Sequence, residues 1–232
     1  MPKITKCIAT LNIAGRKDIE SRIDKIAHFL DRENADIVCL QEVTFNSTES
    51  LAHKINSKLQ NPYEFVQADL AETYVKNGER QTDGLAILSR NRFSKTEVIT
   101  LTKVPDDENG RPDFHKRIAQ LVALGDGTKI ANTHLASNNN SHLQFKELLE
   151  TIPDEYIITG DFNLPKPKML NSKNLWGEKY TCSIEPKDYL SFPKENQTFD
   201  YFLVPKTIEL VDVRIIEGLS DHNAIVCEIN KM

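Results

Sequence analysis

Residues 156–163 read YIITGDFN and join a β-type segment to a polar turn. Residues 156–159 are bulky and mostly β-branched, a composition that predicts a short buried strand. Residues 160–163, GDFN, follow at once, so the carboxylate of Asp161 and the carboxamide of Asn163 stand at the end of this strand. The stretch therefore predicts a buried strand with two polar side chains at its end, a position that can face a cleft.

The same arrangement recurs along the chain, with predicted buried strands that meet polar residues at their ends. These residues are Asn12 in the strand predicted at 4–13, Glu42 after 36–40, His134 after 129–133, Asp200 within 199–204, and Asp221 and His222 before 224–229. A packed sheet can gather its strand ends into one cleft. Carboxylates and carboxamides gathered there suit a hard cation such as Mg²⁺. Zinc would require several Cys or His ligands, and the four cysteines form no CxxC pair.

Phosphate ester hydrolysis needs such a set of groups, namely a metal on the phosphoryl oxygen, an activated water and donors for the developing charge. Two histidines beside the carboxylates add capacity for proton transfer or charge stabilisation. Each residue taken alone also has an ordinary explanation as a helix cap, an Asx turn or a hydrogen-bonded structural histidine. The functional hypothesis depends on the joint pattern and on its order.

The remaining pattern predicts the fold class. Apolar residues at helical spacing predict helices at residues 19–30, 51–59 and 143–149. Further strands are predicted at 84–88, 117–124 and 208–215, and Gly125-Asp126-Gly127 predicts a hairpin turn. Residues 103–113 predict a surface loop. Many strands with about three helices suit two packed sheets covered by helices, a layered α/β architecture.

Composition limits the class of protein. The 232 residues are 39% hydrophobic and 27% charged, with no linker-like segment, so we expect a single domain over residues 1–232. The net charge is -5, so binding a polyanion would need a local basic patch or metal ions. The sequence has no signal-peptide pattern and no run of 18 apolar residues. We expect a reduced, cytoplasmic monomer without a membrane span.

The order of the motifs resembles the endonuclease/exonuclease/phosphatase family from Thr10 to Asn223. The segments that carry the resemblance are Thr10-Leu11-Asn12, Leu40-Gln41-Glu42-Val43, the Gly84-led GLAILSR, Asn132-Thr133-His134-Leu135, Gly160-Asp161-Phe162-Asn163, Phe199-Asp200-Tyr201 and Ser220-Asp221-His222. Ile is commoner in the family than Phe199. The resemblance implies a four-layer α/β sandwich, with two packed mixed β-sheets flanked by helices and the site at one mouth between the sheets.

The resemblance also implies a role for each residue. Glu42 would bind Mg²⁺, for which Mn²⁺ could substitute, with help from Asn12 and Asp221. Asp161 would orient or deprotonate the attacking water. The other implied phosphate contacts are Asn163, His134, His222 paired with Asp200, and Arg117, which has a salt bridge at a strand end as its alternative.

The substrate class stays open between three hypotheses. Abasic-site endonucleases of the family typically carry Tyr where this chain has His134, which argues against that branch. The leading hypothesis is a phosphodiesterase that acts on nucleic acid, as a nuclease or a DNA-end phosphodiesterase. The alternative enzyme is a phosphatase or phospholipase-like hydrolase of small or lipid phosphoesters, of the inositol phosphate or sphingomyelin type. An inactive binding module on the same fold is the third, although the expected catalytic residues are all present.

Overall fold

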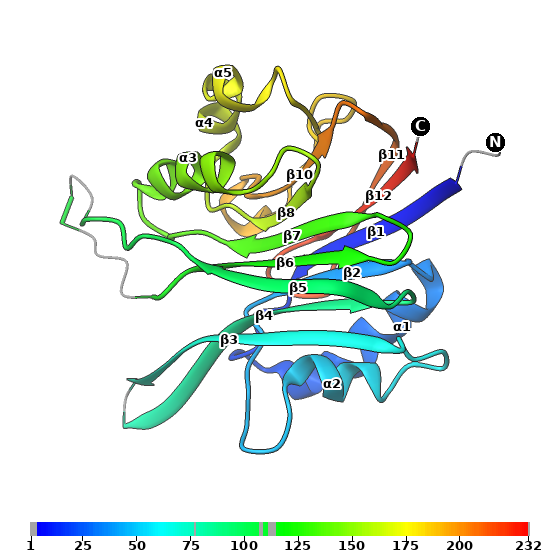
Figure 1. Ribbon diagram of the computed structural model, residues 1–232. Helices are drawn as coiled ribbons and strands as arrows, with labels where there is room; N and C mark the ends of the chain where they lie inside the picture. The colour runs from blue at the N-terminus through cyan, green and yellow to red at the C-terminus, as the bar shows by residue number, and fades with distance from the viewer. Residues whose placement is uncertain (1–3, 77, 107–108, 111–114, 232) are drawn as a thin grey trace.

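The computed structural model describes residues 4–76, 78–106, 109–110 and 115–231. Two β-sheets lie face to face, and helices cover the outer face of each, which gives four layers (Figure 1). Both sheets are mixed, because each contains one parallel and several antiparallel strand pairs. The predicted α/β sandwich of two packed mixed sheets with flanking helices is confirmed.

The first sheet has six strands among the described residues, in the order β11-β12-β1-β2-β4-β3. Its strands are β1 (Ile4–Asn12), β2 (Ile37–Gln41), β3 (Phe65–Lys76), β4 (Glu79–Ser89), β11 (Ile208–Ile216) and β12 (Ala224–Lys231). β1 runs parallel to β2 and antiparallel to β12. The polar ends of β1 and β2 therefore lie at the same edge of the sheet, away from the two chain termini (Figure 1).

The second sheet also has six strands within the described part of the chain, in the order β5-β6-β7-β8-β10-β9. Its strands are β5 (Phe93–Thr100), β6 (Ile118–Leu124), β7 (Lys129–His134), β8 (Ile157–Asp161), β9 (Tyr180–Cys182) and β10 (Asp200–Pro205). β7 and β8 run parallel, and β10 runs antiparallel to β8. The predicted hairpin joins β6 to β7, and Gly127 there has a positive φ of 81°.

The helices only partly follow their predicted bounds. The helices and 3₁₀ turns are η1 (Ile19–Ser21), α1 (Ile23–Glu33), α2 (Leu51–Asn56), α3 (Ser141–Thr151), α4 (Lys166–Asn171), α5 (Lys173–Trp176) and η2 (Pro193–Glu195). The helix predicted at 19–30 is interrupted, since Ile19 belongs to a 3₁₀ turn and the α-helix begins after Arg22. The helix predicted at 51–59 ends at Asn56, although Leu59 remains buried.

The predicted loop at 103–113 has no regular structure in its described part. Residues 107–108 and 111–113 of that prediction lie outside the described residues.

Two hydrophobic clusters hold the layers together. One fills the space between the sheets and continues under α3, where the rings of Phe145, Phe162 and Tyr201 pack at tilted angles with centroid separations of 5.5 Å. The other packs α1 and α2 against the first sheet through residues such as Leu30 and Leu40. Burying one such side chain stabilises the fold by about 1.5–3 kcal/mol.

Buried carboxamides cross-link the two sheets close to one end. The Gln41 Nε2 on β2 donates to the Asn132 Oδ1 on β7 at 2.7 Å and to the Thr10 Oγ1 at 3.0 Å. The Asn132 Nδ2 in turn donates to the carbonyl oxygens of Leu40 and Ala86. Because such buried polar groups are costly unless paired, these bonds favour one relative position of the sheets.

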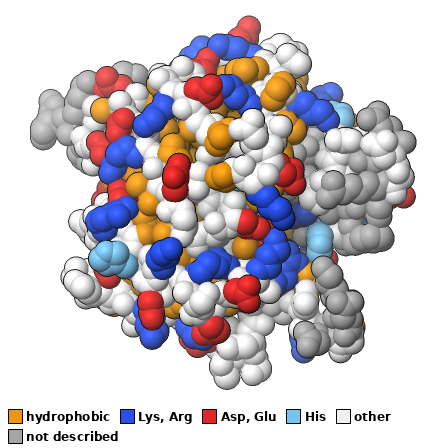
Figure 2. Space-filling view, turned by 180° about the vertical axis from the view of Figure 1, so that it is seen from behind, with side chains coloured by type: hydrophobic (Ala, Val, Ile, Leu, Met, Phe, Trp, Pro, Cys, Tyr) orange, Lys and Arg blue, Asp and Glu red, His pale blue; other side chains and the backbone are white. Residues whose placement is uncertain are grey.

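Acidic and basic side chains are interspersed with hydrophobic ones on the face seen from behind (Figure 2). None of the helices within the described ranges is long and apolar enough to cross a membrane.

Candidate active site

Three of the polar residues predicted from the strand ends stand side by side on the second sheet. Asp161, the last residue of β8, pairs with His134 of the parallel strand β7 and with Asp200 of the antiparallel strand β10. Side chains of directly paired residues point to the same face of a sheet. The row His134–Asp161–Asp200 therefore faces the first sheet, and all three side chains are buried.

His222 joins this row from the loop before β12. Its Nδ1 lies 2.8 Å from the Asp200 Oδ2, and its Nε2 lies 3.7 Å from the Asp161 Oδ2. The Ser220 hydroxyl fixes the loop, because it donates to the Asn12 carbonyl at 2.6 Å and accepts from the His222 N–H at 2.8 Å. The ring of Phe192 packs on the imidazole with a centroid separation of 4.7 Å.

Burial and neighbouring charges move the pKa values of these groups apart. Burial alone would lower the pKa of His222, but Asp200 and then Asp161 raise it to about 10. Burial, followed by the charge of Asp200, raises the pKa of Asp161 to about 7. Burial and the nearby Arg117 hold the pKa of His134 well below its usual range. At neutral pH the site thus combines a charged His222, a neutral His134 and a carboxylate close to its titration midpoint, which suits acid–base chemistry.

Asn12 connects this row to the first sheet. Its Nδ2 donates to the Asp161 Oδ2 at 3.0 Å and to the Glu42 Oε1 at 3.2 Å. Glu42 follows β2 directly and has a positive φ of 53°, a conformation that turns the chain sharply at the strand end. Asn12, Glu42 and Asp161 were predicted to lie together, and the structure brings them together.

Arg16 and Asp83 also belong to this side of the site, and sequence reasoning missed both. The Arg16 Nη2 lies 3.2 Å from the Glu42 Oε2 and 3.4 Å from the Asp83 Oδ2. Burial raises the pKa of Asp83 to about 6, although Arg16 opposes the shift. The one sequence signal for Asp83 was its place directly before the Gly84 strand motif.

Asp221 and Arg117 lie at the border of this centre, where their charges act on His222 and His134. The Asp221 Oδ2 lies 2.8 Å from the Lys17 Nζ, and no described contact links it to Glu42 or Asn12. Burial would raise the pKa of Asp221, but the hydrogen bond from Lys17 lowers it below its usual range. Arg117 is buried and lines a small recess with Asp83 and His134, so its charge acts on both of these groups.

Asn163 is placed by its backbone, which has a positive φ of 47°. Its N–H donates to the Asp161 Oδ1, and its Nδ2 donates to the Leu135 carbonyl, both at 2.9 Å. The Oδ1 of Asn163 is the atom that remains for a ligand.

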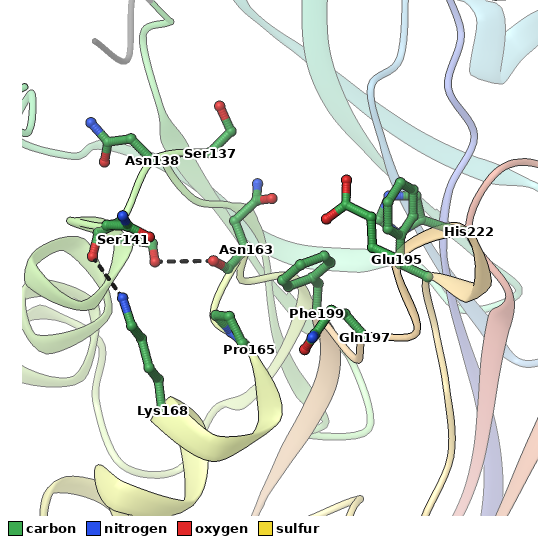
Figure 3. Close-up of a pocket in the computed structure, with 12 residues that line it drawn as sticks. Ser137, Asn138, Ser141, Asn163, Pro165, Lys168, Glu195, Gln197, Phe199 and His222 are labelled. Carbon is green, nitrogen blue, oxygen red and sulfur yellow. Dashed lines mark hydrogen bonds between the residues drawn. The ribbon is translucent and has the colours of Figure 1, made fainter. Parts of the chain in front are cut away.

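A pocket of about 320 Å³ adjoins the site and shares His222 and Asn163 with it. Asn138 and Lys168 lie on one side of the pocket, Glu195 and His222 lie on the other, and Phe199 lies between them (Figure 3). The half-buried rings of Phe192 and Phe199, 5.8 Å apart, form its apolar part. The pocket thus offers aromatic surface together with several side-chain amides next to the reactive groups.

The sequence model of the endonuclease/exonuclease/phosphatase family matches residues 9–222. The chain belongs to this family. The predicted membership is confirmed over the segment that contains every residue of the site. None of the curated proteins that were compared matches the sequence.

Solved structures agree on the fold at low sequence identity. An endonuclease/exonuclease/phosphatase from Beutenbergia cavernae aligns with a TM-score of 0.80 at 17% identity, over 98% of this chain and 72% of that chain. TDP2 from D. rerio, complexed with a single-strand DNA product, aligns with a TM-score of 0.66 at 17% identity, over 97% and 99% of the two chains. The 3′ phosphatase NExo from Neisseria, bound to a product DNA hairpin, gives a TM-score of 0.65 at 18% identity, over 96% and 98%.

Members of this family typically use a divalent metal, and the oxygen-rich donors of this site fit one. Glu42 and Asp161 direct carboxylate oxygens toward the same Asn12 amide, and no described residue donates a hydrogen bond to the buried Asp200 Oδ1. Possible ligand atoms of Asp161, Asp200 and His222 also lie within 4.8 Å of one another. A cation bound to His222 would have to displace a proton that Asp200 stabilises. The carboxylate and amide oxygens are therefore the better ligands for a hard cation.

Proposed function

We propose that this protein is an Mg²⁺-dependent phosphodiesterase that hydrolyses nucleic acid by attack of water on phosphorus. The observation that carries the proposal is the row His134–Asp161–Asp200 with His222 bonded to Asp200, directly opposite Asn12 and Glu42. This row places a base, a charged donor and oxygen ligands around one point. Family membership makes phosphoester hydrolysis the general expectation.

Each side chain receives a role that its geometry supports. Glu42 would hold the metal, which when bound would neutralise charge on a phosphoryl oxygen. Asn12, whose Oδ1 already accepts the Ala14 N–H, holds Glu42 and Asp161 in place through its Nδ2. The Asp161 Oδ2 accepts a proton from the water whose oxygen bonds to phosphorus, and its pKa of about 7 suits a base at neutral pH. The bond from phosphorus to the leaving oxygen then breaks, and that oxygen departs with the bonding electron pair and takes up a proton from solvent.

His222 donates from Nε2 to the phosphoryl oxygen on which negative charge develops, because Asp200 keeps its ring protonated. Neutral His134 orients the phosphate. The Asn163 Oδ1 accepts a hydrogen bond from the attacking water and so orients it. We propose no direct metal contact for Asp221, whose Oδ2 already accepts a hydrogen bond from the Lys17 Nζ.

The adjoining pocket supports a nucleic acid substrate over a small phosphoester. Phe192 and Phe199 offer ring surface for stacking, and Gln197 offers an amide for the edge of a base. A multiply phosphorylated inositol would need several cations, whereas this pocket pairs the cations Lys168 and His222 with the carboxylate of Glu195. A base can enter such a pocket only after it has left its stack, so single-stranded ends are the preferred substrate.

A substrate panel with Mg²⁺ tests the proposal. The panel contains single-stranded DNA, duplex DNA, RNA, 5′-tyrosyl DNA, abasic duplex DNA and inositol phosphates, each assayed with and without EDTA. We expect turnover of single-stranded nucleic acid or of DNA ends, little incision at abasic sites, and no turnover in EDTA. Turnover restricted to inositol phosphates would support the small-phosphoester alternative, and DNA binding without any turnover would support a binding module.

A further inference from the structure

The positively charged group that contacts Glu42 is the guanidinium of Arg16. One nitrogen of the Arg16 guanidinium, Nη2, contacts both Glu42 and Asp83, at 3.2 and 3.4 Å. The other terminal nitrogen, Nη1, donates to the Tyr74 hydroxyl, and the guanidinium carbon lies 5.7 Å from the centroid of that ring. Three side chains, one directly after β2 and one each from β3 and β4, therefore share one cation.

The backbone fixes the position of Arg16. The Ala14 N–H donates to the Asn12 Oδ1 at 3.0 Å, and the Gly15 N–H donates to the Glu42 carbonyl at 3.2 Å. A Cβ atom at Gly15 would lie only 2.4 Å from that carbonyl oxygen, so the close approach requires glycine. Arg16 is the next residue, and its side chain consequently starts beside Glu42.

Arg16 balances the negative charges of two largely buried carboxylates, those of Glu42 and Asp83. Glu42 and Asp83 keep only 17% and 8% of their side-chain surface exposed, so two carboxylates are largely removed from water close to each other. Such a pair is costly without a cation to balance it. A divalent cation on Glu42 would supply this balance, but it would also repel a guanidinium a few ångströms away.

We propose that Arg16 is an internal counter-ion that competes with the divalent metal for Glu42. It balances Glu42 and Asp83 in the metal-free protein, and it gives up Glu42 but keeps Asp83 and Tyr74 when the metal binds. The inference rests on the proposed role of Glu42 as the metal ligand. Its consequence is that Arg16 weakens metal affinity and so keeps the metal exchangeable.

A purely orienting role for Arg16 predicts the opposite sign. If the guanidinium served only to aim the Glu42 carboxylate at the metal, its loss would weaken metal binding. If it competes, its loss tightens binding. The sign of the change in metal affinity therefore distinguishes the two roles.

Isothermal titration of the metal-free protein with Mn²⁺, repeated with Mg²⁺, measures this sign. We expect Arg16→Gln to lower the dissociation constant about tenfold, equivalent to about 1.4 kcal/mol. Arg16→Lys keeps the charge and should stay within about threefold of wild type, less than 1 kcal/mol. Arg92→Gln removes the same charge from an exposed position outside the site and should not change the dissociation constant.

Two further measurements separate the possible failures. Glu42→Gln should abolish the Mn²⁺ binding, and wild-type binding that does not depend on Glu42 would remove both the proposed metal site and the counter-ion. If binding depends on Glu42 but is unchanged or weaker in Arg16→Gln, the counter-ion is overturned while the metal site stands. Thermal unfolding should show that Arg16→Gln is less stable than wild type without metal and gains more stability from saturating Mn²⁺.

Discussion

Replacing Asp200 by asparagine removes one negative charge from the site and preserves the size of the side chain. Asp200 is 1% exposed, and its Oδ2 lies 2.8 Å from the His222 Nδ1. An asparagine oxygen can still accept this hydrogen bond, so the fold and the ring orientation should survive. What changes is the charge that keeps the imidazole protonated.

The structure sets the size of the effect. Asp200 is the strongest of the influences that raise the pKa of His222 to about 10, and burial opposes them. Without the Asp200 charge we expect this pKa to fall toward the ordinary value of about 6.5. At pH 8 the protonated fraction would then drop from nearly complete to about 3%, a roughly thirtyfold loss of the active donor. Removing the donor outright, in His222→Ala, should cost on the order of 10²–10³ in turnover.

The assay is turnover at saturating Mg²⁺ and substrate from pH 6 to 9 for wild type, both single variants and the double variant. Asp200→Asn should recover turnover as the pH falls toward 6.5. The base should remain available there, because Asp200 is also a charge that raises the pKa of Asp161. The double variant should be little worse than His222→Ala, since residues that act as a unit are non-additive.

Nitrogen chemical shifts of His222 in the metal-free protein provide a test that does not depend on turnover. At pH 8 the ring should be charged in wild type and mostly neutral in Asp200→Asn. Fully multiplicative losses in the double variant, or a charged ring in Asp200→Asn at pH 8, would refute the pairing of the two residues.

Four other variants probe the remaining parts of the site. Glu42→Gln should lower turnover by several orders of magnitude and abolish Mn²⁺ binding, whereas near-normal turnover at limiting Mg²⁺ would remove Glu42 from the metal site. Burial raises the pKa of Asp161 from 3.8 to about 7, so its ionisation destabilises the metal-free fold as the pH rises through that interval. Asp161→Asn should therefore raise the free energy of unfolding at pH 8 by on the order of 4 kcal/mol and leave it unchanged near pH 3, as chemical denaturation can measure. Phe192→Leu and Phe199→Leu should each raise the KM for single-stranded DNA roughly five- to hundredfold, which corresponds to the loss of about 1–3 kcal/mol of base stacking. The control Leu175→Ala, at an exposed position, should leave the KM unchanged. An unchanged KM in both phenylalanine variants would show that no base binds in the pocket.

The parts of the fold that the sequence predicts are those with strong local patterns. Buried strands such as β2 and β8 begin with consecutive apolar residues, and their polar ends mark the site. The edge strands β3 and β5 were not predicted, because Leu70, Val75 and Val98 are exposed and the alternation is weak. The order of the strands in each sheet could not be predicted either, because the periodicity of apolar residues does not indicate which strands pair.

The parts of the site that sequence reasoning missed depend on contacts between distant segments. Arg16 and Asp83 lie outside the matched motifs, and only the fold places both against Glu42. Asp221 lies in a recognised motif, yet its carboxylate is paired with Lys17, a neighbour that a linear motif cannot reveal. A motif thus identifies which residue types meet, whereas side-chain partners decide which of their atoms remain available.

The position of the site also explains the buried amides between the sheets. Asn12 belongs to the first sheet and Asp161 to the second, and their bond of 3.0 Å joins residues that are 149 positions apart in the chain. An apolar interface alone would tolerate small shifts between the sheets, because hydrophobic contact is not directional. Gln41 pairs with Asn12 on the neighbouring strand, and Asn132 lies two residues before His134 on β7. The hydrogen bond from Gln41 to Asn132 therefore lies beside the site, and it is lost if either sheet slides. We therefore interpret this pair as a device that specifies the relative position of the sheets, so that Asn12 reaches Asp161 across the interface.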